Sequence, residues 1–242
     1  MSESLERLTE VPELTAEEIQ ARVLHRDGLM LVIDKPAGLP VHRGPKGGAN
    51  LESSFDGLRF GLPRPPVLAH RLDRDTSGCL VLGRHRKATA SLGLLFKHGK
   101  ISKTYWAVVE GGPDTDEGRI DIPLGKLDEQ RGWWMKPDPH GQPAATTWKV
   151  MGRGPGRTWL ALEPLTGRTH QLRVHSAEMG WPIVGDNIYG RAPRVGGPPL
   201  HLHSREIVVP ISKNKPPVAV TAPVPAHMRE LLSACGWKEG AQ

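Results

Sequence analysis

The sequence is poor in cysteine and has no long apolar segment. Its 242 residues include two cysteines, Cys79 and Cys235, which lie 156 positions apart. This spacing gives neither a disulfide framework nor a metal knuckle, so a reducing, cytoplasmic setting is expected. No apolar run approaches the roughly 20 residues of a membrane-spanning helix. The opening, MSESLERLTEVPEL, lacks the basic start and apolar stretch of a signal peptide. We therefore expect neither secretion nor a membrane partner.

The charged residues are unevenly distributed. Residues 1–20 hold six Glu and one Arg, a net charge of −5. The whole chain has 32 basic and 26 acidic residues, so the rest carries 31 and 20, a net charge of +11. A basic body favours an anionic partner, because Lys and Arg displace counterions from phosphates. A high-pI enzyme with no such partner explains the composition equally well.

Short apolar runs between Gly- and Pro-rich turns predict a mixed α+β fold with a largely antiparallel sheet, flanking helices and a central cleft between two lobes. Residues 1–22 form an acidic leader and residues 23–242 one catalytic domain. Strands are expected at 29–33, 79–82, 101–110, 146–151, 159–164, 184–185 and 206–209. Helices are expected at 16–23, 51–58, 87–97, 171–180 and 226–235.

The segment HRLDRDTSG, residues 70–78, carries the densest polar chemistry. It places carboxylates, guanidiniums, an imidazole and hydroxyls directly before a strand that reads as buried. Such a loop must satisfy its polar groups internally or face a ligand. An ion-paired turn that caps the strand is the structural alternative.

A second polar segment, TGRTHQLRVH, spans residues 166–175. Arg168, His170, Arg173 and His175 crowd the start of an expected helix, where backbone N–H groups also favour anions. The two segments lie about a hundred residues apart, which suggests that they converge on one site.

Taken in order, these motifs resemble those of the RluA-type pseudouridine synthases. The matching stretches are LMLVIDKPAG at 29–38, HRLDRDTSG, SKTYWAVVEG at 102–111, GRTHQLRVH, GDNIYG at 185–190 and LHSREIVVP at 202–210. The resemblance runs from about residue 23 to residue 232. One HRLD motif is weak evidence, whereas several motifs in the correct order are strong evidence.

The resemblance implies an enzyme that isomerises uridine in ribosomal or transfer RNA and needs no cofactor and no metal. Asp73 matches the catalytic carboxylate, with Asp75 as its rival. The carboxylate must be ionised inside a closed pocket, and a nearby guanidinium favours that form. Arg173 matches the residue that supplies it; a surface cation is the alternative. Whether Asp73 attacks C1′, adds to the uracil ring or removes the 2′ proton stays open.

The remaining site residues also follow from the resemblance. Tyr105, which is otherwise an ordinary core residue of a strand, would stack on the target uracil, an interaction worth about 1–3 kcal/mol. The uridine would first have to leave its stack. The residues expected to contact RNA are His70, Arg71, Arg168, His170 and Gln171. We expect a monomer that binds RNA and not DNA.

Four points limit or compete with this interpretation. About 22 residues precede the core, too few for the S4-type RNA-binding module that many relatives carry. Asp73 and Asp75 could instead form the carboxylate pair of a glycoside hydrolase, but nothing supplies the geometry that activates water. The chain could also be an RNA-binding module without catalysis, although its nucleophile loop is intact. Zinc is disfavoured, because the histidines at 70, 170, 175, 201 and 203 form no ligand triplet.

A path of basic residues flanks the proposed site in the sequence and suggests contacts with phosphates. A charge run more often marks a solvated face. The path consists of Arg43, Lys46, Arg59, Arg64, Arg84, Arg86, Lys87, Lys97, Lys100 and Lys103.

Overall fold

The structure is a computed structural model, and it describes residues 13–44, 47–128, 134–212 and 214–240. The chain divides into two compact units. Unit 1 comprises residues 1–101 and 206–223, and unit 2 comprises residues 102–205 and 224–242. Each unit is built on antiparallel strands with a small number of helices, so the mixed, largely antiparallel α+β class is confirmed. Within the described residues, no helix is both long and apolar enough to cross a membrane.

Unit 1 is organised around the fully buried strand β4. Strand β2 pairs with β4 in antiparallel register, and Lys35 at the end of β2 lies opposite Gly78. Helix α3 packs against the same strand, and its Leu92 is buried in the core with Val81 and Ile207. The elements of this unit are α2 (Ala16–Ala21), β1 (Val23–Arg26), β2 (Met30–Lys35), η2 (Glu52–Leu58), β3 (Val67–Leu68), β4 (Ser77–Gly83), α3 (Arg86–Lys97) and β12 (Val218–Thr221). Strand β11 (Leu202–Val209) has residues in both units.

The short helix α2 begins at a capping box. The Thr15 hydroxyl accepts from the Glu18 N–H, and the Glu18 carboxylate accepts from the Thr15 N–H. Such reciprocal bonds satisfy backbone donors that a helix start leaves unpaired. Ile19 is fully buried where α2 packs on the 3-10 helix η2, and Gly57 leaves room for Ala16 there. The helix expected after Thr15 is thus confirmed. Residues 1–12 of the leader lie outside the described residues.

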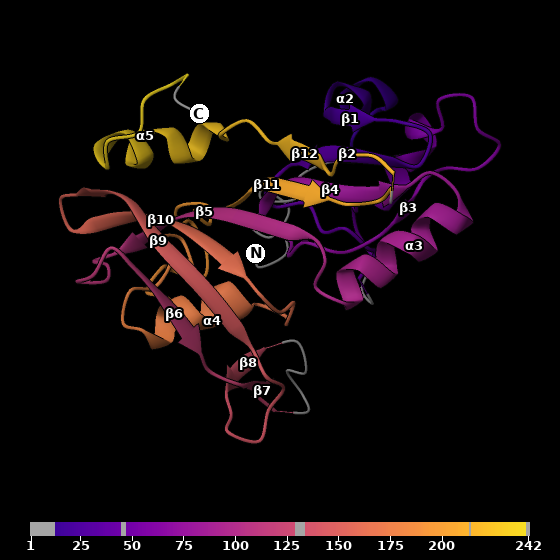
Figure 1. Ribbon diagram of the computed structural model, residues 1–242. Helices are drawn as coiled ribbons and strands as arrows, with labels where there is room; N and C mark the ends of the chain where they lie inside the picture. Colours follow the sequence, from indigo (N-terminus) through magenta and orange to yellow (C-terminus); the bar gives the residue numbers. More distant parts are fainter. Residues whose placement is uncertain (1–12, 45–46, 129–133, 213, 241–242) are drawn as a thin grey trace. The chain divides into compact units, whose positions relative to one another are not determined.

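Unit 2 is built on the strand order β5-β10-β9-β6, drawn from magenta to orange in Figure 1. Long strands β9 and β10 form a hairpin, and β10 pairs on its other side with β5. Helix α5 contributes Met228 and Leu232 to a core shared with Trp106 and Trp159. The elements of this unit are β5 (Ser102–Glu110), β6 (Glu117–Asp121), β7 (Leu124–Lys126), β8 (Met135–Pro137), β9 (Ala145–Gly154), β10 (Arg157–Pro164), α4 (Gln171–Glu178) and α5 (Ala226–Ala234).

Most expected elements are present, with two corrections. The strand expected at residues 184–185 is a turn, because Gly185 adopts a positive φ of 81°. Strands β9 and β10 extend further toward their connecting turn than expected. Gly152 and Gly154 lie inside β9, beyond the end expected for this strand. Both positions require glycine, because a Cβ there would collide with backbone carbonyls at the end of α5.

Candidate functional site

Asp73 lies in a tight turn immediately before β4. The Thr76 N–H donates to the Asp73 carbonyl over 3.2 Å, which closes the turn. Leu72 is buried, whereas Asp73 is half-buried. The turn is therefore anchored in the core of unit 1 by an apolar residue, while the neighbouring carboxyl group keeps partial access to solvent.

Lys35 stabilises this turn through hydrogen bonds to its backbone, a role that the sequence did not indicate. Its side chain is completely buried, and its Nζ donates to the carbonyl oxygens of Pro36, Arg74 and Thr76 over 2.8, 2.8 and 2.9 Å. Burial lowers the pKa of Lys35 from 10.5 to about 7, against the carboxylates of Asp75 and Asp73, which raise it. Three acceptors match the three protons of an ammonium group. The ammonium form of Lys35 thus joins the end of β2 to the loop that holds Asp73.

The neighbours of Asp73 take different roles. Asp75 lies 3.6 Å from Arg74, whose Nε also donates to the Gly38 carbonyl, so this part of the segment is ion-paired as the structural alternative expected. His70 accepts the Val81 N–H at Nε2 over 3.0 Å, and its ring stacks on Phe96. His70 thus braces the loop against β4 and α3.

Arg71 is exposed. Arg71 and His70 are the residues of this segment that were expected to contact RNA, and Arg71 is the more accessible of the two.

Tyr105 lies in strand β5 of unit 2, opposite Leu162 of β10, and is 9% exposed. Most of the ring is therefore enclosed by protein, as the core alternative expected.

Arg173 is not a surface cation. It is 3% exposed on α4, and its Nε and Nη2 donate to the two carboxylate oxygens of Asp186, each over 2.8 Å. Asp186 also accepts the N–H groups of Ile188 and Tyr189. Burial opposes the ionised form of Asp186, but the hydrogen bonds from Arg173 and the backbone outweigh it, and its pKa stays below the usual value. Asp186, in the GDNIYG motif, was overlooked in the sequence, although a carboxylate is the natural partner of a buried guanidinium.

The turn before α4 is held by internal bonds. His170 has a left-handed backbone with φ of 52°, unusual for a residue other than glycine, and its Nδ1 lies 2.8 Å from the Tyr189 hydroxyl. Arg168 is half-buried, and its Nε donates to the Pro143 carbonyl. Gln171 is 3% exposed, with its amide fully used inside the protein. Its side chain therefore has little access to a ligand in this conformation.

The histidines considered as metal ligands are separated. His175 contacts Thr146, and His201 stacks edge-on against His227. Among the residues that the structure describes, no three His, Cys, Asp or Glu side chains come together in a group suited to a metal ion.

The basic path is only partly available to a ligand. Both Nη atoms of Arg84 donate to backbone carbonyls, those of Asp27, Arg59 and Phe60, so this arginine fastens loops together. Lys103 is half-buried, and this burial lowers its pKa. Lys46 lies outside the described residues. Exposed cations on α3 and its flanks remain, including Arg86 and Lys100.

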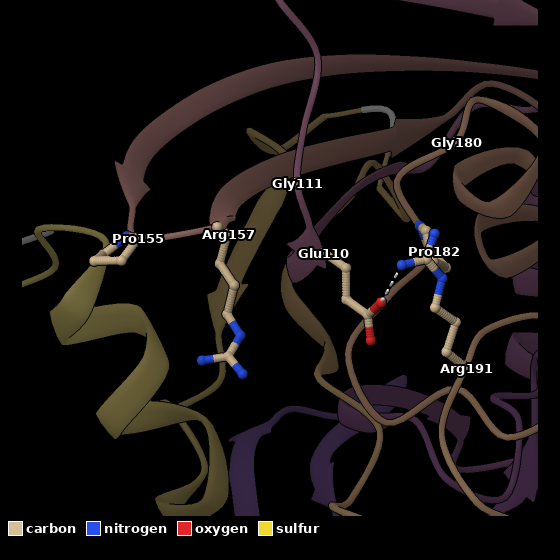
Figure 2. A pocket seen from close by; sticks show the side chains of 8 residues that line it. Glu110, Gly111, Pro155, Arg157, Gly180, Pro182 and Arg191 are labelled. Atoms are coloured by element: carbon tan, nitrogen blue, oxygen red, sulfur yellow. Dashed lines mark ion pairs between the residues drawn. The ribbon is translucent and has the colours of Figure 1, made fainter.

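A hollow of about 470 Å³ opens in unit 2 at the end of β5 (Figure 2). Arg157, Glu110 and Arg191 border it, and Glu110 pairs with Arg191 over 3.9 Å. None of the residues expected at the site from the sequence lines this hollow. It is a feature separate from the two motif loops.

Comparisons with known proteins give one consistent result. Residues 29–178 match the family model described as RNA pseudouridylate synthase. An uncharacterised RNA pseudouridine synthase of Zymomonas mobilis is 44% identical over 214 residues, which cover 87% of this chain and 96% of that protein. Ribosomal large subunit pseudouridine synthase C of Haemophilus ducreyi is 33% identical, covering 89% of this chain and 69% of the relative. The solved structure of human RNA pseudouridylate synthase domain containing 4 superposes with a TM-score of 0.76 at 27% identity, covering 91% and 95% of the two chains.

Proposed function

Because the chain belongs to the RNA pseudouridylate synthase family and is an RluA-type enzyme, we propose that Asp73 is the carboxylate with which it converts uridine to pseudouridine in ribosomal or transfer RNA. The reaction breaks the N1–C1′ bond of the nucleotide and forms a C5–C1′ bond. C5 loses its proton, and N1 ends with one. Composition and mass are unchanged, so the isomerisation requires no net oxidant or reductant.

The observation that carries the proposal is the construction of the Asp73 turn. The half-buried Asp73 lies in a loop whose Arg74 and Thr76 carbonyls are bonded to the buried Lys35 side chain. The Thr76 N–H closes a hydrogen-bonded turn on the Asp73 carbonyl. Breaking the glycosidic bond develops positive charge on the sugar, and a carboxylate held in a fixed position can stabilise or trap it. Asp75 is the weaker candidate, since it already faces Arg74.

Tyr105 and Arg173 are proposed as the partners of Asp73 in the reaction. Tyr105 would stack on the flipped uracil. Arg173 would supply positive charge that favours the ionised carboxylate. Support comes from the motif match and from Asp186, whose two hydrogen bonds hold the planar, permanently charged guanidinium in one orientation.

For RNA binding, Arg71 and Arg168 are proposed to contact phosphates. Arg71 is exposed, and Arg168 is half-buried, with its Nε bonded to the Pro143 carbonyl. His70 and His170 are proposed to shape the two loops, with their ring nitrogens bonded inside the protein. The ribosomal name of the Haemophilus ducreyi relative supports ribosomal RNA over transfer RNA. We propose a monomer, and a chain whose two cysteines lie 156 positions apart in the sequence fits the cytoplasm as its compartment.

The test is product analysis with the purified full-length chain. RNA from cells that lack the protein is incubated with wild type, Asp73→Asn and Asp75→Asn, then digested to nucleosides and separated by mass spectrometry. Wild type and Asp75→Asn are expected to convert uridine into an isomer of identical mass, and Asp73→Asn is expected to convert none. Released free uracil would show hydrolysis instead. Conversion by Asp73→Asn at the wild-type rate would refute the role of this carboxylate.

A further inference from the structure

A chain of hydrogen bonds runs through unit 2 from the turn before α4. The Thr166 hydroxyl accepts from the Ala145 N–H over 3.1 Å and donates to Gln171 Oε1 over 2.6 Å. Gln171 Oε1 also accepts the Arg168 N–H over 3.0 Å. The Gln171 Nε2 group donates its two protons to the Ala145 carbonyl over 2.9 Å and to Thr146 Oγ1 over 3.0 Å. The amide of Gln171 therefore has all its donors and acceptors in use.

The chain continues to His175, and the Ile122 carbonyl determines its direction. A carbonyl oxygen can only accept, so His175 Nε2, 3.0 Å from it, carries a proton and donates. In the neutral ring Nδ1 is then an acceptor, so Thr146 Oγ1, 2.9 Å away, donates its proton to Nδ1 while it accepts from Gln171. Burial lowers the pKa of His175 and so keeps the ring neutral, although the Asp121 carboxylate opposes this shift. The hydrogen bonds thus define the tautomer of the ring.

The positions along α4 connect this chain to Arg173. Gln171 and His175 are four residues apart and share one face of the helix, which meets Thr146 at the start of β9. Arg173 is two residues from each and points to Asp186 on another side. Helix α4 is therefore held by polar contacts on two faces. Thr146, Gln171, Arg173 and His175 are all buried.

We propose that Thr146, Gln171 and His175 are positioning residues for the isomerisation: their directed hydrogen-bond chain sets the rotation of α4 and, with it, the direction of the Arg173 guanidinium. The inference rests on the proposed function, in which Arg173 acts at the reacting uridine. It assigns Gln171 to the interior framework, in place of the RNA contact expected from the sequence. Rate sensitivity follows because a displacement of about 1 Å in a reacting group can lower a rate about 100-fold.

The test compares Thr146→Val with Thr146→Ser. Valine keeps the shape of threonine and suits a strand, but it removes the hydroxyl in the middle of the chain. Serine keeps the hydroxyl and loses a methyl group, so it controls for packing. Single-turnover conversion is measured on RNA from cells lacking the protein, and affinity is measured by filter retention of the same end-labelled RNA. We expect Thr146→Val to react at least tenfold more slowly than wild type and Thr146→Ser to stay within threefold, with both affinities within threefold of wild type.

Two results would overturn the inference. One is a Thr146→Val rate within threefold of the Thr146→Ser rate. The other is a loss of RNA affinity equal to the loss of rate, because the chain would then shape the binding surface and not the reaction. Should Thr146→Val fail to fold, His175→Asn and His175→Leu decide the same question. Asparagine can still accept from Thr146 at the position of Nδ1, so its rate should exceed that of the leucine variant at least threefold; equal rates would reject the inference.

The same experiment separates this inference from the function on which it rests. The proposed function fails if the wild-type chain forms no pseudouridine, or if Arg173→Met reacts at the wild-type rate. The positioning role fails if wild type is active, Arg173→Met is inactive, and Thr146→Val is as fast as Thr146→Ser.

Discussion

The stability of the wild-type chain relative to a Lys35→Met variant is expected to rise with pH. Lys35 has a pKa of about 7 in the folded chain and 10.5 as its ordinary value. The folded state holds the Lys35 proton less tightly than the unfolded state does. Burial of the ammonium group therefore lowers the free energy of unfolding most below pH 7, and this destabilisation decreases as the pH rises toward 10.5. Methionine has a similar length, fills the same buried space and does not titrate.

The expected size of the effect follows from the two pKa values. Each unit of pH between them is worth about 1.36 kcal/mol in the free energy of unfolding. From pH 7.5 to pH 9.5 the wild type should therefore gain about 2.5 kcal/mol over Lys35→Met. This window lies above the pKa of the neighbouring Asp34 carboxyl group, which burial raises to about 6. The titration of Asp34 therefore does not enter the comparison.

Urea unfolding followed by circular dichroism measures the difference at both pH values. Lys149→Met, which removes a lysine from the exposed side of β9, serves as the control for the loss of one surface charge. A difference between wild type and Lys35→Met that stays constant between pH 7.5 and 9.5 would refute the reasoning. It would mean that the three carbonyl oxygens keep Lys35 charged throughout the window.

Two further predictions concern buried contacts. Arg173→Met alone should lower the free energy of unfolding by about 3–5 kcal/mol, because it leaves Asp186 buried without its cation. The double variant Arg173→Met/Asp186→Asn should recover part of that loss, while both variants stay inactive. Urea unfolding of the two variants measures this, and a single variant as stable as wild type would contradict it. A surface cation, the alternative for Arg173 that the sequence left open, would cause no such loss of stability. Gly57→Ala should lower the free energy of unfolding by about 1–3 kcal/mol, because the new Cβ would lie 2.9 Å from the Ala16 Cα and push α2 away from η2. The melting temperature measures this effect, and an unchanged value would show that this contact does not hold α2.

The local elements were predictable where one residue pattern dominates. The apolar run that forms β4, the helical spacing of Ala88 and Leu92 in α3, and Thr15 with its capping glutamate all point to one structure. The full extent of β9 was not predictable, since the glycines at 152 and 154 are explained by α5, a segment distant in the sequence.

The candidate site was also predictable only in part. The motif loops around Asp73 and Arg173 could be found from their unusual density of polar residues. The partners that hold these loops could not, because Lys35 lies about 40 residues before Asp73, and Thr146 lies 25 residues before Gln171. Neither lysine at a strand end nor threonine in a strand carries a distinctive signal, and their roles depend on hydrogen-bond directions that only the folded backbone defines. For the same reason Gln171 was expected to face RNA, whereas its amide is satisfied inside unit 2.

The central claim is that the Asp73 carboxylate carries the conversion of uridine to pseudouridine in a cellular RNA. Mapping pseudouridines in cells that lack the chain, and in the same cells supplied with wild type or Asp73→Asn, tests it most directly. One or more sites should vanish with the chain, return with wild type and stay absent with the asparagine variant. Identical maps for wild type and Asp73→Asn would contradict the claim.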